Sequence, residues 1–298
     1  MKQDYQQLLK PEIINSLSGL GLISRMIVEG FLSGLNHSRR LGSGMEFSQY
    51  RGYEPGDDMR LLDWKMLARS GRYYIKQSEI ETHVEIRFIL DASQSMLYEE
   101  EGLSKMDYAR VLIASLAWLS QSQGDAVGLY ALNDKKLYAL QPKVVKNNFN
   151  RLLYELIHIQ PAGKWPVQPH TINQFQNRNH KQLTFFISDL YEEVSELTQS
   201  IANLKTPRNE VVVLQLLTKS ELEFNYKGDF TFEDIETGKQ IEVNAKQTQT
   251  SYLKNLQNFL TTTKNQFLAQ DISYQLFQLG EPLGEALQLL LKTRKHLL

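Results

Sequence analysis

Within residues 84–96, an apolar segment is followed by three oxygen-bearing side chains. The segment begins as Val-Glu-Ile-Arg-Phe-Ile-Leu, a composition typical of a buried strand, and continues into Asp91, Ser93 and Ser95. Carboxylate, hydroxyl and water oxygens are the ligands that Mg²⁺ and Mn²⁺ prefer. These three residues therefore predict a metal site at the end of the strand. The alternative is a loop whose Asp and Ser side chains cap the next helix or bond local backbone.

A second carboxylate follows a second apolar segment. Residues 182–187 read Gln-Leu-Thr-Phe-Phe-Ile and lead through Ser188 to Asp189. If the two strands are parallel and adjacent, Asp91 and Asp189 emerge at the same edge of the sheet, where α/β proteins bind ligands. The alternative is that Asp189 caps a helix over residues 192–204. The repeated pattern favours a shared site.

The region over residues 36–82 is dense in Arg, Asp, Trp and Gly. The pattern predicts a turn at Pro55-Gly56, a short helix over 61–68 and a strand over 72–80. Two interpretations stay open. The structural one is a salt-bridged cap on the sheet, and the functional one is a partner-binding platform. The residues that would serve either role are Arg51, Tyr53, Asp57, Asp58, Arg60, Asp63, Trp64 and Arg69. Arg60 and Asp63 stand at helical spacing for an ion pair, and a buried Trp64 would contribute about 3–5 kcal/mol.

Three motifs in this order resemble one family. They are Gly-x-Gly-x-Glu-Phe at 42–47, Arg-x-Tyr-x-Pro-Gly-Asp-Asp-x-Arg-x-x-Asp-Trp-x-x-x-Ala-Arg at 51–69, and Asp-x-Ser-x-Ser-Met at 91–96. The chain resembles, over residues 20–295, the bacterial domain-of-unknown-function family numbered fifty-eight. That family carries a von Willebrand factor A-like domain, and its genes typically sit beside those of MoxR-type AAA+ ATPases.

The resemblance implies a metal-ion-dependent adhesion site (MIDAS) and no known catalysis. Mg²⁺, or Mn²⁺, would be held by Ser93 and Ser95 directly, and by Asp91 and Asp189 directly or through water. An acidic side chain of a protein partner can complete the octahedron in such sites. The expected role is a metal-dependent adaptor for a MoxR-type ATPase.

One expected ligand of an adhesion site is missing from the sequence. Such sites usually place a Thr in the loop before the strand that brings the second Asp. Here Lys164 or Trp165 stands about where that Thr is expected, and Thr171 lies several residues further on. We therefore expect metal binding to be weak or absent. The hypothesis is that the Lys164 ammonium sits between Asp91 and Asp189 in place of the ion.

The remaining pattern predicts an α/β protein with a mainly parallel sheet flanked by helices, and the family resemblance implies that it is of the Rossmann-like, von Willebrand factor A-like type. We divide the chain into an N-terminal cap over 1–81, with helices broken around Gly19 and Gly21, and an α/β domain over 82–298. Further helices are predicted over 104–121, 146–157, 171–177, 249–269 and 282–291, further strands over 125–132, 136–140, 210–217 and 271–277, and an inserted β-hairpin over 229–243.

Composition and missing motifs narrow the function. A net charge of −1 does not indicate a nucleic-acid binder, and 0 cysteines exclude disulfides and thiolate metal sites. No phosphate-binding loop, dinucleotide fingerprint or nucleophile elbow is present, and the 6 histidines lack zinc-site spacing. With no signal core or membrane span, we expect a cytoplasmic, non-enzymatic protein. The alternatives are a Mg²⁺-dependent hydrolase that uses the strand-end carboxylates, and a metal-free structural adaptor.

Overall fold

The computed structural model describes residues 8–38, 50–54, 64–76, 84–145, 147–166, 181–191, 194–226, 228–235 and 238–297. The chain forms two compact units. The larger joins Met1–Leu32 to His83–Leu298, and the smaller is Ser33–Thr82.

Within the described part of the larger unit, six strands form the main sheet in the order β12-β9-β8-β3-β6-β7. Their bounds are β3 (Glu85–Asp91), β6 (Ala126–Leu132), β7 (Leu137–Lys143), β8 (Gln182–Ser188), β9 (Asn209–Leu217) and β12 (Ser273–Gln278). All neighbours pair in parallel except β7, which pairs antiparallel with β6 at one edge, as predicted. This is the common doubly wound order, and its topological switch point lies between β3 and β8.

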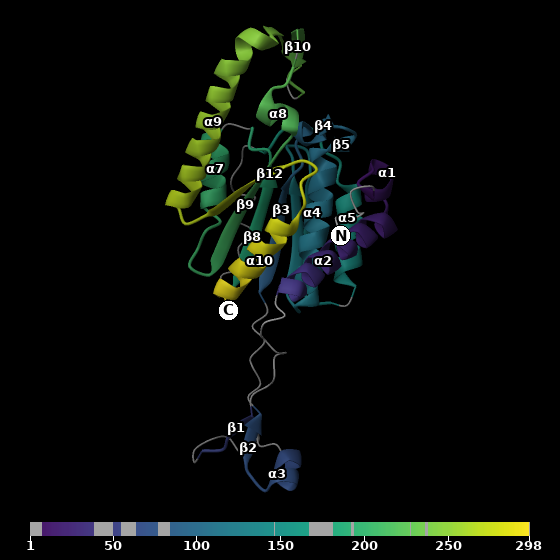
Figure 1. Ribbon diagram of the computed structural model, residues 1–298, viewed down its shortest axis with the longest axis vertical. Coiled ribbons are helices and arrows are strands. Elements are labelled where there is room, and N and C mark those ends of the chain that lie inside the picture. Colours follow the sequence, from purple (N-terminus) through teal and green to yellow (C-terminus); the bar gives the residue numbers. More distant parts are fainter. Residues whose placement is uncertain are drawn as a thin grey trace. The chain divides into compact units, whose positions relative to one another are not determined.

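Helices cover both faces of the sheet (Figure 1). Alternating side chains of the central strands explain this, since Phe88 and Leu90 of β3 join one core cluster and Ile89 joins the other. The first cluster includes side chains of α1 (Pro11–Ile14), α2 (Leu17–Ser38), α4 (Lys105–Ser122), α5 (Asn148–His158) and α10 (Gly284–Leu297). The second includes side chains of α7 (Val194–Ala202) and α9 (Ala245–Ala269).

The N-terminal helices differ from the prediction in two ways. They pack into the main core through Ile14, Leu20 and Ile23, so residues 1–32 belong with the sheet and not with a cap over 1–81. The break lies between α1 and α2, not at Gly19 and Gly21, which are inside α2. The reason at Gly19 is close packing, because a Cβ there would lie 2.2 Å from the carbonyl oxygen of Ile13.

The smaller unit holds the motif-rich region. The strand β1 (Tyr50–Gly52) pairs antiparallel with β2 (Tyr74–Lys76), and the helix α3 is Trp64–Ser70. Trp64 is 63% exposed, so contacts within its own unit do not bury it and do not support the large stability contribution expected of a buried Trp. Arg69 lies in the last turn of α3. Four residues of the proposed cap lie outside the described part of the chain: Asp57, Asp58, Arg60 and Asp63.

Short elements that the pattern missed surround the carboxyl ends of the strands. They are the 3₁₀ turn η3 (Gln94–Leu97), the strands β4 (Glu99–Glu100) and β5 (Leu103–Ser104), and the helix α8 (Lys219–Glu223). The predicted hairpin is present as β10 (Asp229–Glu233) and β11 (Gln240–Asn244). The predicted helix over 171–177 lies outside the described residues.

Candidate functional site

The two strand-end carboxylates lie at the switch point of the sheet. β3 and β8 are adjacent and parallel, with Leu90 paired to Ile187, which confirms the predicted juxtaposition of these strand ends. Asp91 is fully buried. Its Oδ1 accepts a hydrogen bond from the Ser93 N–H (2.9 Å), and its Oδ2 accepts one from the Ser188 hydroxyl (2.7 Å). Asp91 is thereby held in one orientation at the end of β3.

Ser93 and Ser95 place two hydroxyl oxygens beside this carboxylate. Their Oγ atoms lie 3.0 Å apart, and Ser93 is buried while Ser95 is partly exposed. The capping alternative is not supported for Ser93, because its side chain caps no backbone N–H of η3. The following helix α4 is capped instead by Ser104, whose Oγ accepts from the Asp107 N–H at 3.0 Å. The two hydroxyls are therefore available as hard oxygen ligands.

Burial of Asp91 and the negative charge of Asp189 together raise the pKa of Asp91 from its usual 3.8 to about 7. Hydrogen bonds from Ser188 and Ser93 oppose this shift without overcoming it. Two carboxylates close together in a buried site favour binding of a cation that neutralises both. The electrostatics at Asp91 therefore match the donor set for a hard divalent ion.

A residue that the sequence reasoning missed supplies positive charge to this site. The Nζ atom of Lys105 lies 3.0 Å from Oδ2 of Asp189 and 2.7 Å from Oε1 of Glu221, and its side chain is 1% exposed. Burial lowers the pKa of Lys105, but the two carboxylates outweigh that effect and the net pKa is raised. One signal for Lys105 was present in the sequence. A lysine directly after an N-cap serine is unfavourable with the helix dipole, so acidic partners nearby would be expected.

Glu221 is in turn fixed by the start of α8. Its Oε2 accepts from the Thr218 N–H (2.7 Å) and hydroxyl (2.9 Å), while the Thr218 Oγ1 accepts from the Glu221 N–H (3.2 Å). This reciprocal pair is a capping box, a motif that stabilises helix starts. Thr218 follows β9, so a third strand end contributes to the site. The capping box leaves Oε1 of Glu221 aimed at Lys105.

The hypothesis about Lys164 is wrong. The side chain of Lys164 is exposed, and the ammonium at Asp189 is that of Lys105. The loop does pass beside the site, because the Gly163 carbonyl accepts from the Gln94 N–H at 2.9 Å. Trp165 turns inward instead and packs on Phe186, with ring centroids 5.3 Å apart. Trp165 is buried because it packs on the apolar face of the sheet, whereas the side chain of Lys164 is exposed. Thr171 lies outside the described residues.

The site opens into a pocket of about 310 Å³. Its lining comes from the loop after Asp91, from α4 and α8, from the segment after β8 and from the end of β10 and the residues that follow it: Ser95, Tyr98, Lys105, Asp189, Tyr191, Glu221, Glu233, Asp234 and Ile235. A second pocket of about 380 Å³ shares Tyr98, Tyr191 and Glu221 with it and is walled mainly by aromatic and aliphatic side chains. Among the described residues, no group of three or more His, Cys, Asp or Glu side chains could hold a metal. A metal at this site therefore depends on the serine hydroxyls.

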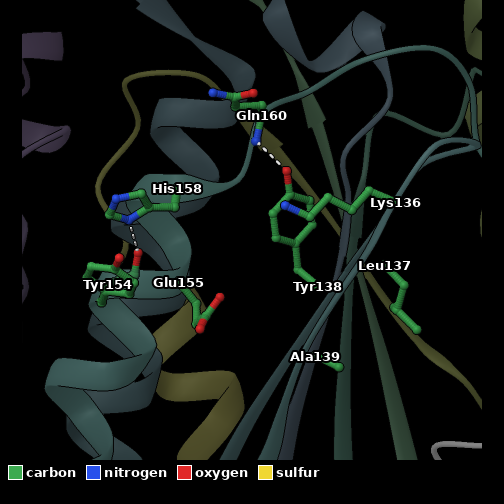
Figure 2. Close-up of a pocket in the computed structure, with 8 residues that line it drawn as sticks. All are labelled: Lys136, Leu137, Tyr138, Ala139, Tyr154, Glu155, His158 and Gln160. Atoms are coloured by element: carbon green, nitrogen blue, oxygen red, sulfur yellow. Dashed lines mark hydrogen bonds between the residues drawn. The ribbon is translucent and has the colours of Figure 1, made fainter.

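Another hollow, of about 440 Å³, lies between β7 and α5 (Figure 2). Its lining does not include the paired Asp and Ser oxygen groups found at the strand ends. The Tyr138 hydroxyl accepts from the Gln160 N–H at 3.2 Å, and the His158 ring is bonded to the Tyr154 carbonyl of its own helix at 2.7 Å. These contacts anchor the end of α5 and the loop that follows it. We assign no ligand to this hollow.

The fold and site define a doubly wound α/β domain with hard oxygen groups at the switch point of its sheet. Residues 49–258 match the family described as "Protein of unknown function DUF58", and the chain belongs to this family. The uncharacterized proteins Rv1480 of Mycobacterium tuberculosis and Mb1516 of Mycobacterium bovis are each 23% identical over 233 residues, which cover 76% of this chain and 72% of the relative.

Solved structures with a related arrangement include BatB from Bacteroides thetaiotaomicron, with a TM-score of 0.47 and 13% identity over 72% of this chain and 99% of that chain. The SpRpn10 VWA domain matches with a TM-score of 0.41 and 10% identity, over 71% of this chain and 95% of that chain. None of the described helices is long and apolar enough to cross a membrane.

Proposed function

We propose that this protein is a non-enzymatic adaptor that binds a protein partner at the switch-point site, with Mg²⁺ or Mn²⁺ as part of the binding surface. One observation carries the proposal. The buried Asp91 and the paired hydroxyls of Ser93 and Ser95 lie at the end of β3, beside the β8 end that brings Asp189. In α/β proteins this crevice is where ligands bind.

The ion would be held by the oxygen atoms of Ser93 and Ser95, with Asp91 and Asp189 as direct or water-mediated ligands. Mg²⁺ keeps water in part of its octahedron, so the bound ion would offer a position to an acidic side chain of the partner. The 310 Å³ pocket beside Ser95 and Asp189 gives such a side chain access. The pocket wall shared with the aromatic pocket would add apolar contacts.

The partner class follows from the family resemblance and not from geometry. Genes of this family typically sit beside those of MoxR-type AAA+ ATPases, so we propose such an ATPase as the partner, in the assembly or maturation of a protein complex. We expect the adaptor and such an ATPase to meet in the cytoplasm.

Binding of the purified protein to the MoxR-type ATPase of the same genome should require Mg²⁺ or Mn²⁺. We expect measurable binding in millimolar Mg²⁺, and its loss in chelator and in the variants Asp91→Asn and Ser95→Ala, because the first removes the negative charge and the second the hydroxyl oxygen that would hold the ion. Pull-down and biolayer interferometry measure this directly. Ser251→Ala, on the exposed surface of α9, is the matched control and should bind like the parent. Equal binding with and without metal would reject the metal-dependent adaptor.

The same preparations should show no metal-dependent hydrolysis of nucleotides or phosphoesters. Hydrolysis needs a positioned general base besides the metal ligands. Asp189 and Glu221, at the mouth of the site, are instead both paired with Lys105. Phosphate release from ATP and from p-nitrophenyl phosphate measures this. Turnover above the buffer rate that disappears in Asp91→Asn would favour the hydrolase alternative.

A further inference from the structure

The position of Lys105 is determined by its backbone as well as by its ion pairs. It is the first residue of α4, directly after the N-cap Ser104. Its N–H donates to the carbonyl of Tyr98 at 3.0 Å, across the short hairpin of β4 and β5. The side chain therefore starts from a well-determined point and runs inward. The ammonium group therefore meets Asp189 inside the protein, and the side chain does not fold back from the surface to do so.

The ammonium group lies in a cage of two carboxylates and two tyrosine rings, at the wall of the 310 Å³ pocket. Asp189 and Glu221 supply carboxylate oxygens at 3.0 and 2.7 Å. The rings of Tyr191 and Tyr98 have their centroids 4.8 and 5.5 Å from Nζ, within the range of cation–π attraction. A buried charge needs interactions that replace those it had with water, and this cage supplies them. The two ion pairs and the two rings thus hold the ammonium within the site.

We propose that Lys105 is the built-in counter-ion of this site: by holding Oδ2 of Asp189, it limits the affinity of the neighbouring oxygen ligands for a divalent cation. The inference rests on the proposed function, because it concerns the same ion. Two effects act in the same direction. The ammonium occupies an oxygen that Asp189 would otherwise offer to the ion or its water, and its positive charge repels the ion. In this protein Lys105 therefore has the role that the sequence had suggested for Lys164.

The proposed effect of Lys105 on metal affinity can be distinguished from a purely structural role of this residue. Lys105 also joins α4, the β8 end and α8 through its two ion pairs, and a structural link of this kind would change stability when removed. It would not change metal affinity. Affinity for Mg²⁺ and Mn²⁺, measured by calorimetry on folded protein, is therefore the deciding measurement.

Lys105→Gln should bind Mg²⁺ and Mn²⁺ at least tenfold more tightly than the parent. Glutamine keeps donors for the carboxylates but removes the charge. Lys105→Arg keeps the charge and should bind metal like the parent. Lys164→Met removes an exposed lysine from the neighbouring loop and is the matched control for net charge; its affinity should stay within about twofold of the parent.

A double variant distinguishes the direct contact of Lys105 with Asp189 from a change in the net charge of the protein. It also gives a second folded protein if the single variant misfolds. Lys105→Gln with Glu221→Gln removes one charge of each sign, and glutamine at position 221 still completes the capping box. Removing both charges of the Lys105–Glu221 pair costs less stability than removing one, while Asp189 remains as a carboxylate without its ammonium partner. The double variant should also bind metal more tightly than the parent, because Asp189 is released from the ammonium.

The outcomes separate the two proposals. If the parent binds metal and both glutamine variants bind it equally well, the inference about Lys105 is wrong while the metal-dependent adaptor stands. If only the glutamine variants bind, the inference holds and the metal requirement of the parent fails. Binding by none of the proteins at millimolar metal would overturn both.

Discussion

Arg110→Met should lower the free energy of unfolding by about 3–5 kcal/mol. Arg110 lies on α4 and is 8% exposed. Its Nε and Nη2 donate to the carbonyls of Leu156 (3.0 Å) and Ile159 (2.7 Å), while Nη1 donates to Asn15 Oδ1 (2.6 Å) and Asp107 Oδ1 (2.8 Å). One buried guanidinium thus joins α4 to the end of α5 and to the turn after α1.

The large effect follows from what the substitution leaves behind. The last carbonyls of a helix have no partner within it, and here Arg110 satisfies carbonyls at the end of α5. Its positive charge also lies at the negative end of the helix dipole. Methionine would leave Asp107, which is 6% exposed, as a carboxylate without its cation. An uncompensated buried charge is among the costliest single defects in a folded protein.

Urea denaturation followed by circular dichroism measures this effect. The control is Arg151→Met on α5, where the arginine is exposed, and it should change the free energy of unfolding by about 0.5 kcal/mol or less. A cost below about 1 kcal/mol for Arg110→Met would show that water replaces the four hydrogen bonds.

Asp91→Asn should stabilise the metal-free protein above pH 7. Burial and the neighbouring Asp189 raise the pKa of Asp91 to about 7, so keeping it ionised in the fold costs free energy. At 1.36 kcal/mol per pKa unit, the shift from 3.8 to about 7 corresponds to roughly 4 kcal/mol. Asparagine has nearly the same shape, and its carbonyl oxygen can still accept from the Ser93 N–H.

The sign of the pH dependence follows from the direction of the shift. Between pH 4 and about 7 the folded protein keeps a proton on Asp91 that the unfolded chain has lost, so the stability contributed by this group falls as pH rises. Below pH 4 both states are protonated, and above about 7 both are ionised, so the contribution is flat there. The advantage of Asp91→Asn should therefore be small at pH 4 and full at pH 8.

Thermal and urea unfolding in chelator, at several pH values between 4 and 8, test this expectation. Asp134→Asn, at an exposed aspartate, should give curves parallel to the parent and serves as the control. An Asp91→Asn variant that is less stable than the parent at pH 8 would show that the fold stabilises the charged form of Asp91.

Much of the fold could be predicted from local patterns. The strand over residues 182–187 appears as Gln182–Ser188, and the inserted hairpin appears at its predicted place. Short apolar segments alternate with amphipathic helical segments, which favours a parallel sheet covered on both faces. Less could be predicted where packing overrides local preference. Gly19 and Gly21 suggested a helix break, but within α2 they allow close packing.

For the candidate site, the sequence by itself placed the oxygen-bearing side chains: Asp91, Ser93, Ser95 and Asp189 follow apolar strands, and strand ends of a parallel sheet meet at one edge. The partners of these charges were decided only by the tertiary structure. Lys105, Asp189 and Glu221 come from three separate elements, and their ion pairs span 84 and 116 residues of the chain. The physical reason is burial. A charge removed from water must be paired, and which groups are removed from water together depends on how the elements pack, not on the residues beside each one in the chain.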